Sequence, residues 1–191
     1  MRRRMTRPRW TSAALAALLL ALIVALTGCE NTRDNNAGRE GLPEEIGHLH
    51  YNVYISRLLN LEDVEDRGYF TGPEAPPGFV HFGVFMHVCN EEDDSEARLA
   101  ASEFKIEDAQ GNSFDPVTVE NDNIWAYRAR PLEYEACIPE EGTLASAGPT
   151  AGSLLIFELP LKALEDRPLN LIINAPPGES GTKTGRVELD V

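Results

Sequence analysis

The chain has 191 residues, of which 42% are apolar, and it carries 31 acidic against 17 basic side chains, a formal net charge of −14. This length suffices for one domain with a single sizeable core. An acidic surface repels phosphate groups and anionic lipid headgroups, so we expect no nucleic-acid partner and no basic membrane-binding patch.

The first 29 residues predict an export signal that ends in a lipidated cysteine. Five arginines come first, an uncharged apolar run from Ala13 to Leu26 follows, and Leu26-Thr27-Gly28-Cys29 resembles a bacterial lipobox. This order is typical of a secretory signal, and the apolar run is too short to span a bilayer comfortably. We therefore expect residues 1–28 to be a lipoprotein signal peptide. The alternative is a plain signal peptide or an uncleaved anchor, in which Cys29 is incidental.

Lipidation of Cys29 would place the protein at the cell membrane, lipid-anchored and facing the extracytoplasmic side. The arginines leave both the general secretory and the twin-arginine export routes open. Residues 29–45 are polar and rich in Asn, Gly and Glu, which predicts a flexible tether that holds the domain about 20 Å from the anchor. The folded domain is then expected at residues 46–191.

Short apolar stretches separated by Gly- and Pro-rich segments predict seven or eight strands and no long helix. They are residues 51–59, 79–89, 104–108, 113–119, 124–129, 152–159, 169–174 and 186–191. Single helical turns are expected at 97–101 and 161–165, long loops at 61–78 and 131–152, and a hairpin turn at 109–112. The pattern favours an all-β, antiparallel β-sandwich.

Residues 79–89 give the strongest strand signal. Apolar side chains fill its even positions, which are Val80, Phe82, Val84, Met86 and Val88. The even face is therefore expected to pack on the core.

Cys89 and Cys137 are expected to form a disulfide, because an exported domain meets an oxidising compartment. Cys89 lies on the opposite face of its strand from the core positions. The bridge should therefore staple a rim or a loop rather than pin two sheets together. The alternative is a pair of buried free thiols.

Three blocks carry a family resemblance: residues 79–90, with a long apolar strand ending in Asn90; residues 104–114, with an Asp-x-x-Gly-Asn hairpin before an aromatic; and residues 152–160, ending in Pro160. Together they resemble immunoglobulin-like domains of Gram-positive, actinobacterial-type lipoproteins, which are sometimes labelled as similar to a telomeric-repeat-binding factor. The resemblance implies an immunoglobulin-like sandwich and an extracytoplasmic location. It implies no catalytic residue, since that family is largely of unknown function.

Motifs for enzymatic chemistry are missing from the sequence. There is no Gly-x-Ser-x-Gly elbow, no phosphate-binding glycine loop, no Cys-x-x-Cys and no His-Glu-x-x-His. We therefore expect no catalytic activity and no cofactor.

Metal binding has weak candidates. His48 and His50 would share one strand face, as would His81 and His87, and imidazoles from neighbouring strands can bind zinc or copper. The alternative is an ordinary polar outer face, so no metal is assigned. Asp63, Glu65, Gly68 and Glu74 fit positions of a calcium-loop template, but an arginine and a proline interrupt it, and a solvated acidic rim explains these residues better.

Trp125, Tyr127 and Arg128 form the best candidate binding patch, because aromatic and arginine side chains anchor many interfaces. The alternative interpretation is that the face carrying the two aromatic side chains belongs to the core. We expect a non-catalytic binding or accessory module whose partner is an envelope protein or a surface ligand. The alternative function is a small-ligand or metal-binding lipoprotein that serves a transporter.

Overall fold

The computed structural model describes residues 37–93, 96–148 and 150–190. The predicted signal peptide, Cys29 and the first part of the predicted tether lie outside these residues. Within them, no helix is long and apolar enough to cross a membrane.

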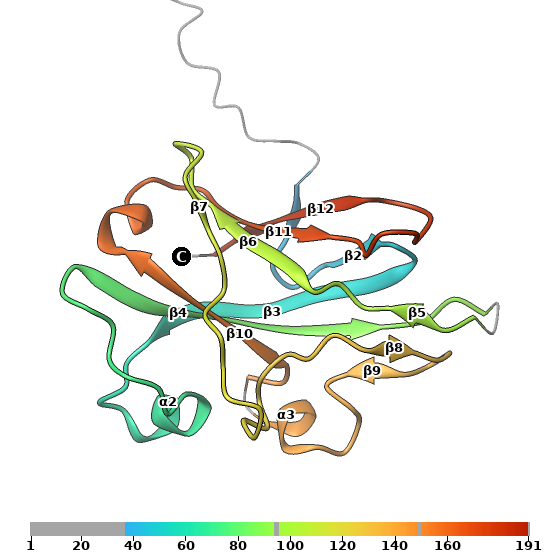
Figure 1. The fold of residues 1–191 in the computed structure, drawn as a ribbon, viewed down its shortest axis with the longest axis horizontal. Coiled ribbons are helices and arrows are strands. Elements are labelled where there is room, and N and C mark those ends of the chain that lie inside the picture. Colours follow the sequence, from blue (N-terminus) through green and yellow to red (C-terminus); the bar gives the residue numbers. More distant parts are fainter. Residues whose placement is uncertain (1–36, 94–95, 149, 191) are drawn as a thin grey trace, which may run out of the picture. The chain divides into compact units, whose positions relative to one another are not determined.

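Twelve strands, two short α-helices and one 3-10 helix make up the described part of the chain (Figure 1). The strands are β1 Gly38–Arg39, β2 Pro43–Ile46, β3 Leu49–Leu59, β4 Phe79–Cys89, β5 Arg98–Leu99, β6 Glu103–Glu107, β7 Ser113–Phe114, β8 Pro131–Leu132, β9 Cys137–Ile138, β10 Ser153–Pro160, β11 Leu169–Asn174 and β12 Thr184–Leu189. The helices are α2 Val64–Tyr69, α3 Leu144–Ala147 and the 3-10 helix η1 Leu161–Leu164.

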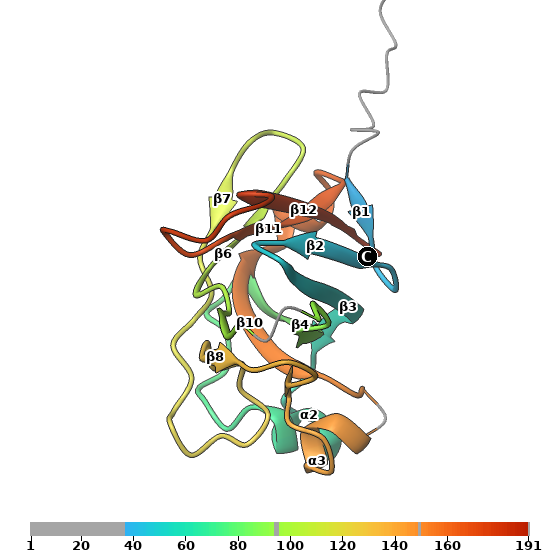
Figure 2. The same ribbon diagram turned by 90° about the vertical axis from the view of Figure 1, so that its right-hand side faces the viewer.

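Two sheets pack face to face, as the side view shows (Figure 2). The first has the order β1-β12-β11-β6-β7, and the second has the order β10-β4-β3-β2 with β9 also on β4. Every pairing between named strands is antiparallel except that of β1 with β12. The all-β antiparallel sandwich is confirmed. The number of strands was predicted too low, because two-residue strands such as β5 and β9 are too short to show alternation.

The predicted core face of β4 is confirmed. Phe82, Val84, Met86 and Val88 are fully buried between the sheets. They meet apolar side chains of the opposite sheet, including Ile106, Leu171, Ile173 and Val187. Burial of this kind contributes about 25 cal/mol for each Å² of apolar surface removed from water and is the main stabilising term.

A second apolar cluster covers the outer face of the β10-β4-β3 sheet. Phe85 of β4 and Ile156 of β10 point outward and are fully buried beneath Tyr69 and Phe70, at the end of α2. The segment 61–78 was predicted to be a loop, which is correct only outside α2. The helix starts at its N-cap Asp63, whose carboxylate accepts the Glu65 N–H at 2.8 Å.

The predicted tether was drawn too far into the chain. β1 and β2 both lie within residues 29–45 or overlap their end, and they pair with β12 and β3. Glu40, between these strands, accepts hydrogen bonds from Ser56 N at 2.8 Å, Ser56 Oγ at 2.6 Å and Asp190 N at 3.0 Å. Sheet-edge hydrogen bonds and not apolar side chains order this segment, so its composition misled the prediction.

Some of the other local predictions are confirmed and others are wrong. The hairpin turn is confirmed, with Gly111 at φ 83° between β6 and β7, and the turn near residue 161 is confirmed as η1. The expected helical turn at 97–101 holds β5 instead, and residues 124–129 form a loop with one isolated bridge from Ala126 to Leu154. The long loop at 131–152 contains β8, β9 and α3.

Candidate functional site

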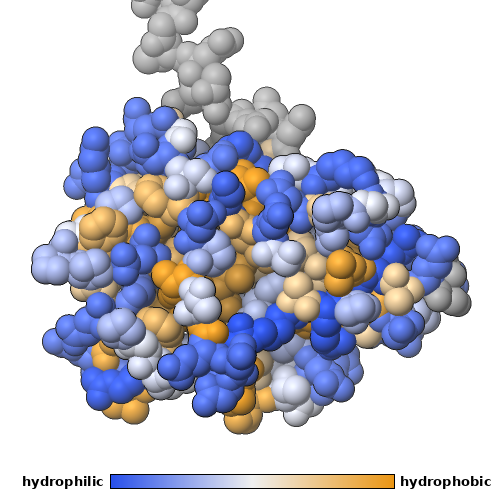
Figure 3. All heavy atoms as spheres, in the orientation of Figure 1, coloured by the Kyte–Doolittle hydropathy of each residue, from blue (hydrophilic) through white to orange (hydrophobic). Residues whose placement is uncertain are grey.

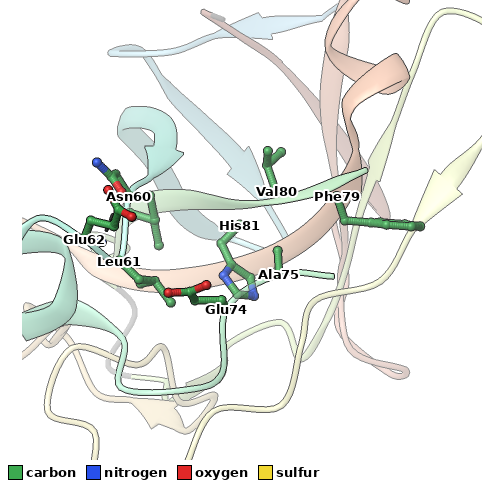
Figure 4. Close-up of a pocket in the computed structure, with 9 residues that line it drawn as sticks. Asn60, Leu61, Glu62, Glu74, Ala75, Phe79, Val80 and His81 are labelled. Atoms are coloured by element: carbon green, nitrogen blue, oxygen red, sulfur yellow. Dashed lines mark hydrogen bonds between the residues drawn. The ribbon is translucent and has the colours of Figure 1, made fainter. Parts of the chain in front are cut away.

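A pocket of about 240 Å³ opens where β3 ends and β4 begins, beside the segment that leads from α2 to β4 (Figure 4). It is lined by Leu59, Asn60, Leu61, Glu62, Glu74, Ala75, Phe79, Val80 and His81. This volume is smaller than that of sites for drug-sized ligands, so the pocket suits a ligand of a few heavy atoms.

His81 is the buried polar group of this pocket, with 5% of its surface exposed. Its ring meets the edge of Phe70 at a centroid distance of 5.0 Å, and it lies opposite Glu158 of β10 in the sheet. Burial lowers the pKa of His81 and outweighs the Glu158 carboxylate, which acts to raise it. The imidazole is therefore neutral at pH 7 and offers one donor and one acceptor.

Glu62 and Glu74 bring carboxylates to walls that are otherwise largely apolar. Figure 4 shows the Glu74 carboxylate between the side chains of Leu61 and His81. The pocket offers hydrogen bonds from His81 and negative charge from Glu62 and Glu74, which suit a small polar or cationic group.

The four histidines do not meet at one point. His81 and His87 lie on the same face of β4, as predicted, but six residues of strand separate them by roughly 20 Å. His87 pairs with Asn52 of β3 and meets the Tyr54 ring at 4.8 Å. Burial lowers the pKa of His87, and its Nε2 has no hydrogen-bond partner in the described structure.

His48 and His50 lie at the other end of β3. His48 is in the turn between β2 and β3 and not on a strand, which corrects the idea that it shares a strand face with His50. The Nδ1 of His50 lies 3.2 Å from a carboxylate oxygen of Glu91.

Of the aromatic pair in the predicted binding patch, Tyr127 is buried and Trp125 is partly buried. Tyr127 is buried in the main core and its hydroxyl donates to Ala101 O at 2.7 Å, while Trp125 packs on the outer cluster against Tyr69 at 4.9 Å. Arg128 is exposed, and its guanidinium donates to backbone carbonyls of the preceding loop. The alternative interpretation, that the aromatics are core residues, is the one that fits.

The calcium-loop template is interrupted by α2. Asp63 is the N-cap of this helix, Gly68 lies inside it, and Glu74 lies some residues away at the pocket. Asp66, which the sequence analysis did not single out, is buried and binds Arg57 and the Asn60 N–H. The acids at the start of this segment hold the helix and do not form a calcium loop.

The Cys89–Cys137 disulfide is present and joins the last residue of β4 to the first residue of β9, with a Cα–Cα distance of 4.2 Å. It links neighbouring strands within one sheet and does not pin the two sheets together, which agrees with the prediction from the parity of Cys89. Arg130 donates a further hydrogen bond to Cys137 O at 2.8 Å. The bridge thereby ties the segment 131–152 to the end of the central strand.

Sequence reasoning missed the pocket, although it identified Glu74 and His81 for other reasons. The pocket depends on α2 and on the path of residues 70–78, and a long polar segment with several prolines gives no signal for either. The structure shows that Phe79, which lines the pocket at the start of β4, is 42% exposed.

The fold and the pocket together define a disulfide-linked all-β sandwich with a small-ligand-sized cavity at one end. No family model and no curated protein matches the chain. Among solved structures, the crystal structure of the yjhA protein from Bacillus subtilis is similar over 80% of this chain and 99% of its own, with a TM-score of 0.52 and 12% sequence identity. At that identity the similarity shows a shared fold.

Proposed function

We propose that this protein is a lipoprotein anchored in the cell membrane through Cys29, with an immunoglobulin-like sandwich that acts outside the cytoplasm as a non-catalytic binding or accessory module. The proposal rests on the order of features at the start of the sequence. Arginines come first, an apolar run follows, and Leu26-Thr27-Gly28-Cys29 then precedes one compact unit from Asn36 to Val191. The Cys89–Cys137 bridge supports an oxidising compartment.

Exposed apolar side chains in and just before the disulfide-linked segment 131–152 support a binding role. Ile124, Tyr134 and Leu144 are 62%, 43% and 68% exposed. Ile124 precedes that segment, Tyr134 lies between β8 and β9, and Leu144 begins α3. Such side chains are typical anchors at interfaces when they lie among polar groups. Figure 3 shows the same mixture on one face, where apolar side chains lie among hydrophilic ones.

The anchor is tested with Cys29→Ser. The wild-type protein should show the added mass of its acyl chains. It should also be recovered with the membrane fraction, because two or more acyl chains give stable anchoring. The variant should lose both properties. Retention in the membrane at an unchanged processed mass would refute lipidation at Cys29.

The binding role is tested by cross-linking in intact cells followed by mass spectrometry of captured proteins. We expect one reproducible envelope partner whose capture falls in Tyr134→Ser and Leu144→Ser. The matched control is Leu42→Ser, because Leu42 is similarly exposed, at 57%, and lies far from residues 124–147 in the sequence. Equal loss in the control, or no partner at good expression, would contradict the proposal.

The second candidate is a small-ligand lipoprotein that serves a transporter, and the His81 pocket favours it. A ligand of this pocket should protect the protein against thermal unfolding, since binding to the native state alone raises its stability. Glu74→Gln should remove that protection for a cationic ligand. Glu103→Gln, an exposed acid on β6, is the control.

A further inference from the structure

Three side chains of metal-ligand type meet at the end of the domain opposite the pocket. Glu45 belongs to β2, His48 to the β2–β3 turn and Glu92 to the segment after β4. One ligand atom of each lies within 4.8 Å of the other two, and His48 Nδ1 is 3.5 Å from Glu45 Oε1. In Figure 1 this is the end where the β2–β3 hairpin, the β11–β12 hairpin and the chain beyond β4 turn.

The His48 imidazole is held from its far side by the β11–β12 hairpin. Its Nε2 is 2.9 Å from Ser180 Oγ, and a Cβ on Gly181 would lie only 3.2 Å from the same nitrogen. The Nε2 side of the ring therefore lies against Ser180 and Gly181, and its Nδ1 faces the Glu45 carboxylate. Histidines that bind metals usually engage their second ring nitrogen in this way, because it fixes the tautomer and the ring orientation.

Glu92 extends from a rigid base. Asn90, two residues earlier, is fully buried, and its amide donates to Glu96 O at 2.9 Å and Leu132 O at 3.0 Å. The Asn90 side-chain oxygen accepts the Glu92 N–H at 3.3 Å, and Cys89 is bonded to Cys137. These bonds hold the backbone next to Glu92 in place, which lowers the entropy cost of assembling the site.

Charge at this cluster favours a cation. The ion-pair partner of Glu45 is His48, and neither Glu45 nor Glu92 has a lysine or arginine partner among the residues that the structure describes. Two close carboxylates raise each other's free energy, and a divalent ion would relieve this repulsion. The imidazole ligand suits zinc, copper, iron and nickel, whereas calcium and magnesium prefer oxygen ligands alone.

We propose that Glu45, His48 and Glu92 bind a divalent transition-metal ion, for which zinc is the test ion, with a fourth position open to water or to a partner's ligand. Zinc holds such ligands at about 2.0–2.2 Å, which places neighbouring ligand atoms about 3.5 Å apart. The cluster is wider than this, and Glu45, with a half-exposed side chain, has the freedom to close the difference. The site requires neither the lipid anchor nor an envelope partner.

The test is zinc titration of the full chain, extracted in detergent and stripped with a chelator. We expect one saturable zinc per chain and a loss of affinity of about tenfold or more in Glu45→Gln, Glu92→Gln and His48→Asn. Asparagine is chosen for His48 because it tolerates the φ of 61° at this position. Calcium in excess should not displace zinc.

The matched controls are His50→Asn and Glu91→Gln, which change the neighbouring imidazole–carboxylate pair and should leave zinc affinity unchanged. Absence of saturable uptake, or equal losses in these controls, would overturn the proposal. Thermal unfolding of each variant checks that it folds. If His48→Asn does not fold, the zinc affinities of Glu92→Gln and Glu91→Gln test the site by themselves. These two variants change adjacent side chains of the same loop, and only Glu92→Gln should weaken zinc binding. Neither result bears on lipidation of Cys29, which has its own test.

Discussion

Removing the Cys89–Cys137 bridge should cost the domain a large part of its stability. The bridge joins residues 48 apart, and the chain-entropy model assigns about 4 kcal/mol to a closed loop of that size at 25 °C. The two-residue pairing of β9 with β4 offers little to replace it, because only Val88–Ile138 and Cys89–Cys137 are in register. We therefore expect the variant with both cysteines changed to serine to lose about 4 kcal/mol of unfolding free energy.

Urea unfolding of the oxidised protein and of this double variant measures the difference. With a slope of about 2 kcal/mol per molar urea, the midpoint should fall by about 2 M. Wild-type protein kept in reductant is the matched control, and it should unfold close to the double variant. A loss below about 1 kcal/mol, or a wild type that is indifferent to reductant, would refute the reasoning, because the bridge would then not restrict the unfolded chain.

Two further predictions concern buried polar groups. Tyr127→Phe should lower the unfolding free energy by about 1–3 kcal/mol, because it leaves Ala101 O buried without its donor; Tyr134→Phe, at an exposed site, should leave thermal unfolding unchanged. Burial acts to raise the pKa of Asp108, but hydrogen bonds from Asn112 and the turn N–H groups outweigh it and hold that pKa below its usual value. The stability that Asp108 adds is therefore present above about pH 4 and lost as the pH falls further, so urea unfolding of Asp108→Asn should approach that of wild type in acid. A difference between the two that is constant with pH would contradict this.

Strand alternation predicted the main core well. The even residues of β4 enter the interior as their pattern required, and the odd position of Cys89 correctly predicted that the bridge does not pin the two sheets together. Such patterns are informative because a strand with one buried face must repeat every second residue. Strands of two residues carry no such repeat, which is why β5 and β9 were not predicted.

The second cluster escaped prediction for a different reason. Phe85 lies on the odd face of β4, which also carries His81, His87 and a glycine, so strand alternation gave no reason to expect it to be buried. Its burial depends on Tyr69 and Phe70 at the end of α2, and the ion pair between Asp66 and Arg57 joins α2 to β3. A helix of six residues has almost no periodicity to detect, and its partner is a sheet face that the sequence alone does not place.

The pocket and the metal-ligand cluster were beyond sequence reasoning because both join segments with no pattern of their own. Glu45 and Glu92 are distant in the chain and meet only because β3 lies between β2 and β4. His48 and His50 are close together in the sequence, but their spacing does not show that one contacts Ser180 and the other Glu91. Register decides such contacts, and it is set by turns and bulges such as the shift between Val53 and Ile55.

The same physical device underlies both ends of the second sheet. Asp66 fixes the backbone at Asn60 beside the pocket, and Asn90 fixes the backbone at Glu92 beside the metal-ligand cluster. Each is a buried polar side chain that satisfies backbone groups just beyond the end of a long strand. A buried polar group is costly to leave unpaired, so each of these side chains strongly favours the local backbone conformation that satisfies it. The two candidate sites therefore depend on side chains that touch neither ligand, and changes at those side chains would alter the sites while leaving the alternation of the core intact.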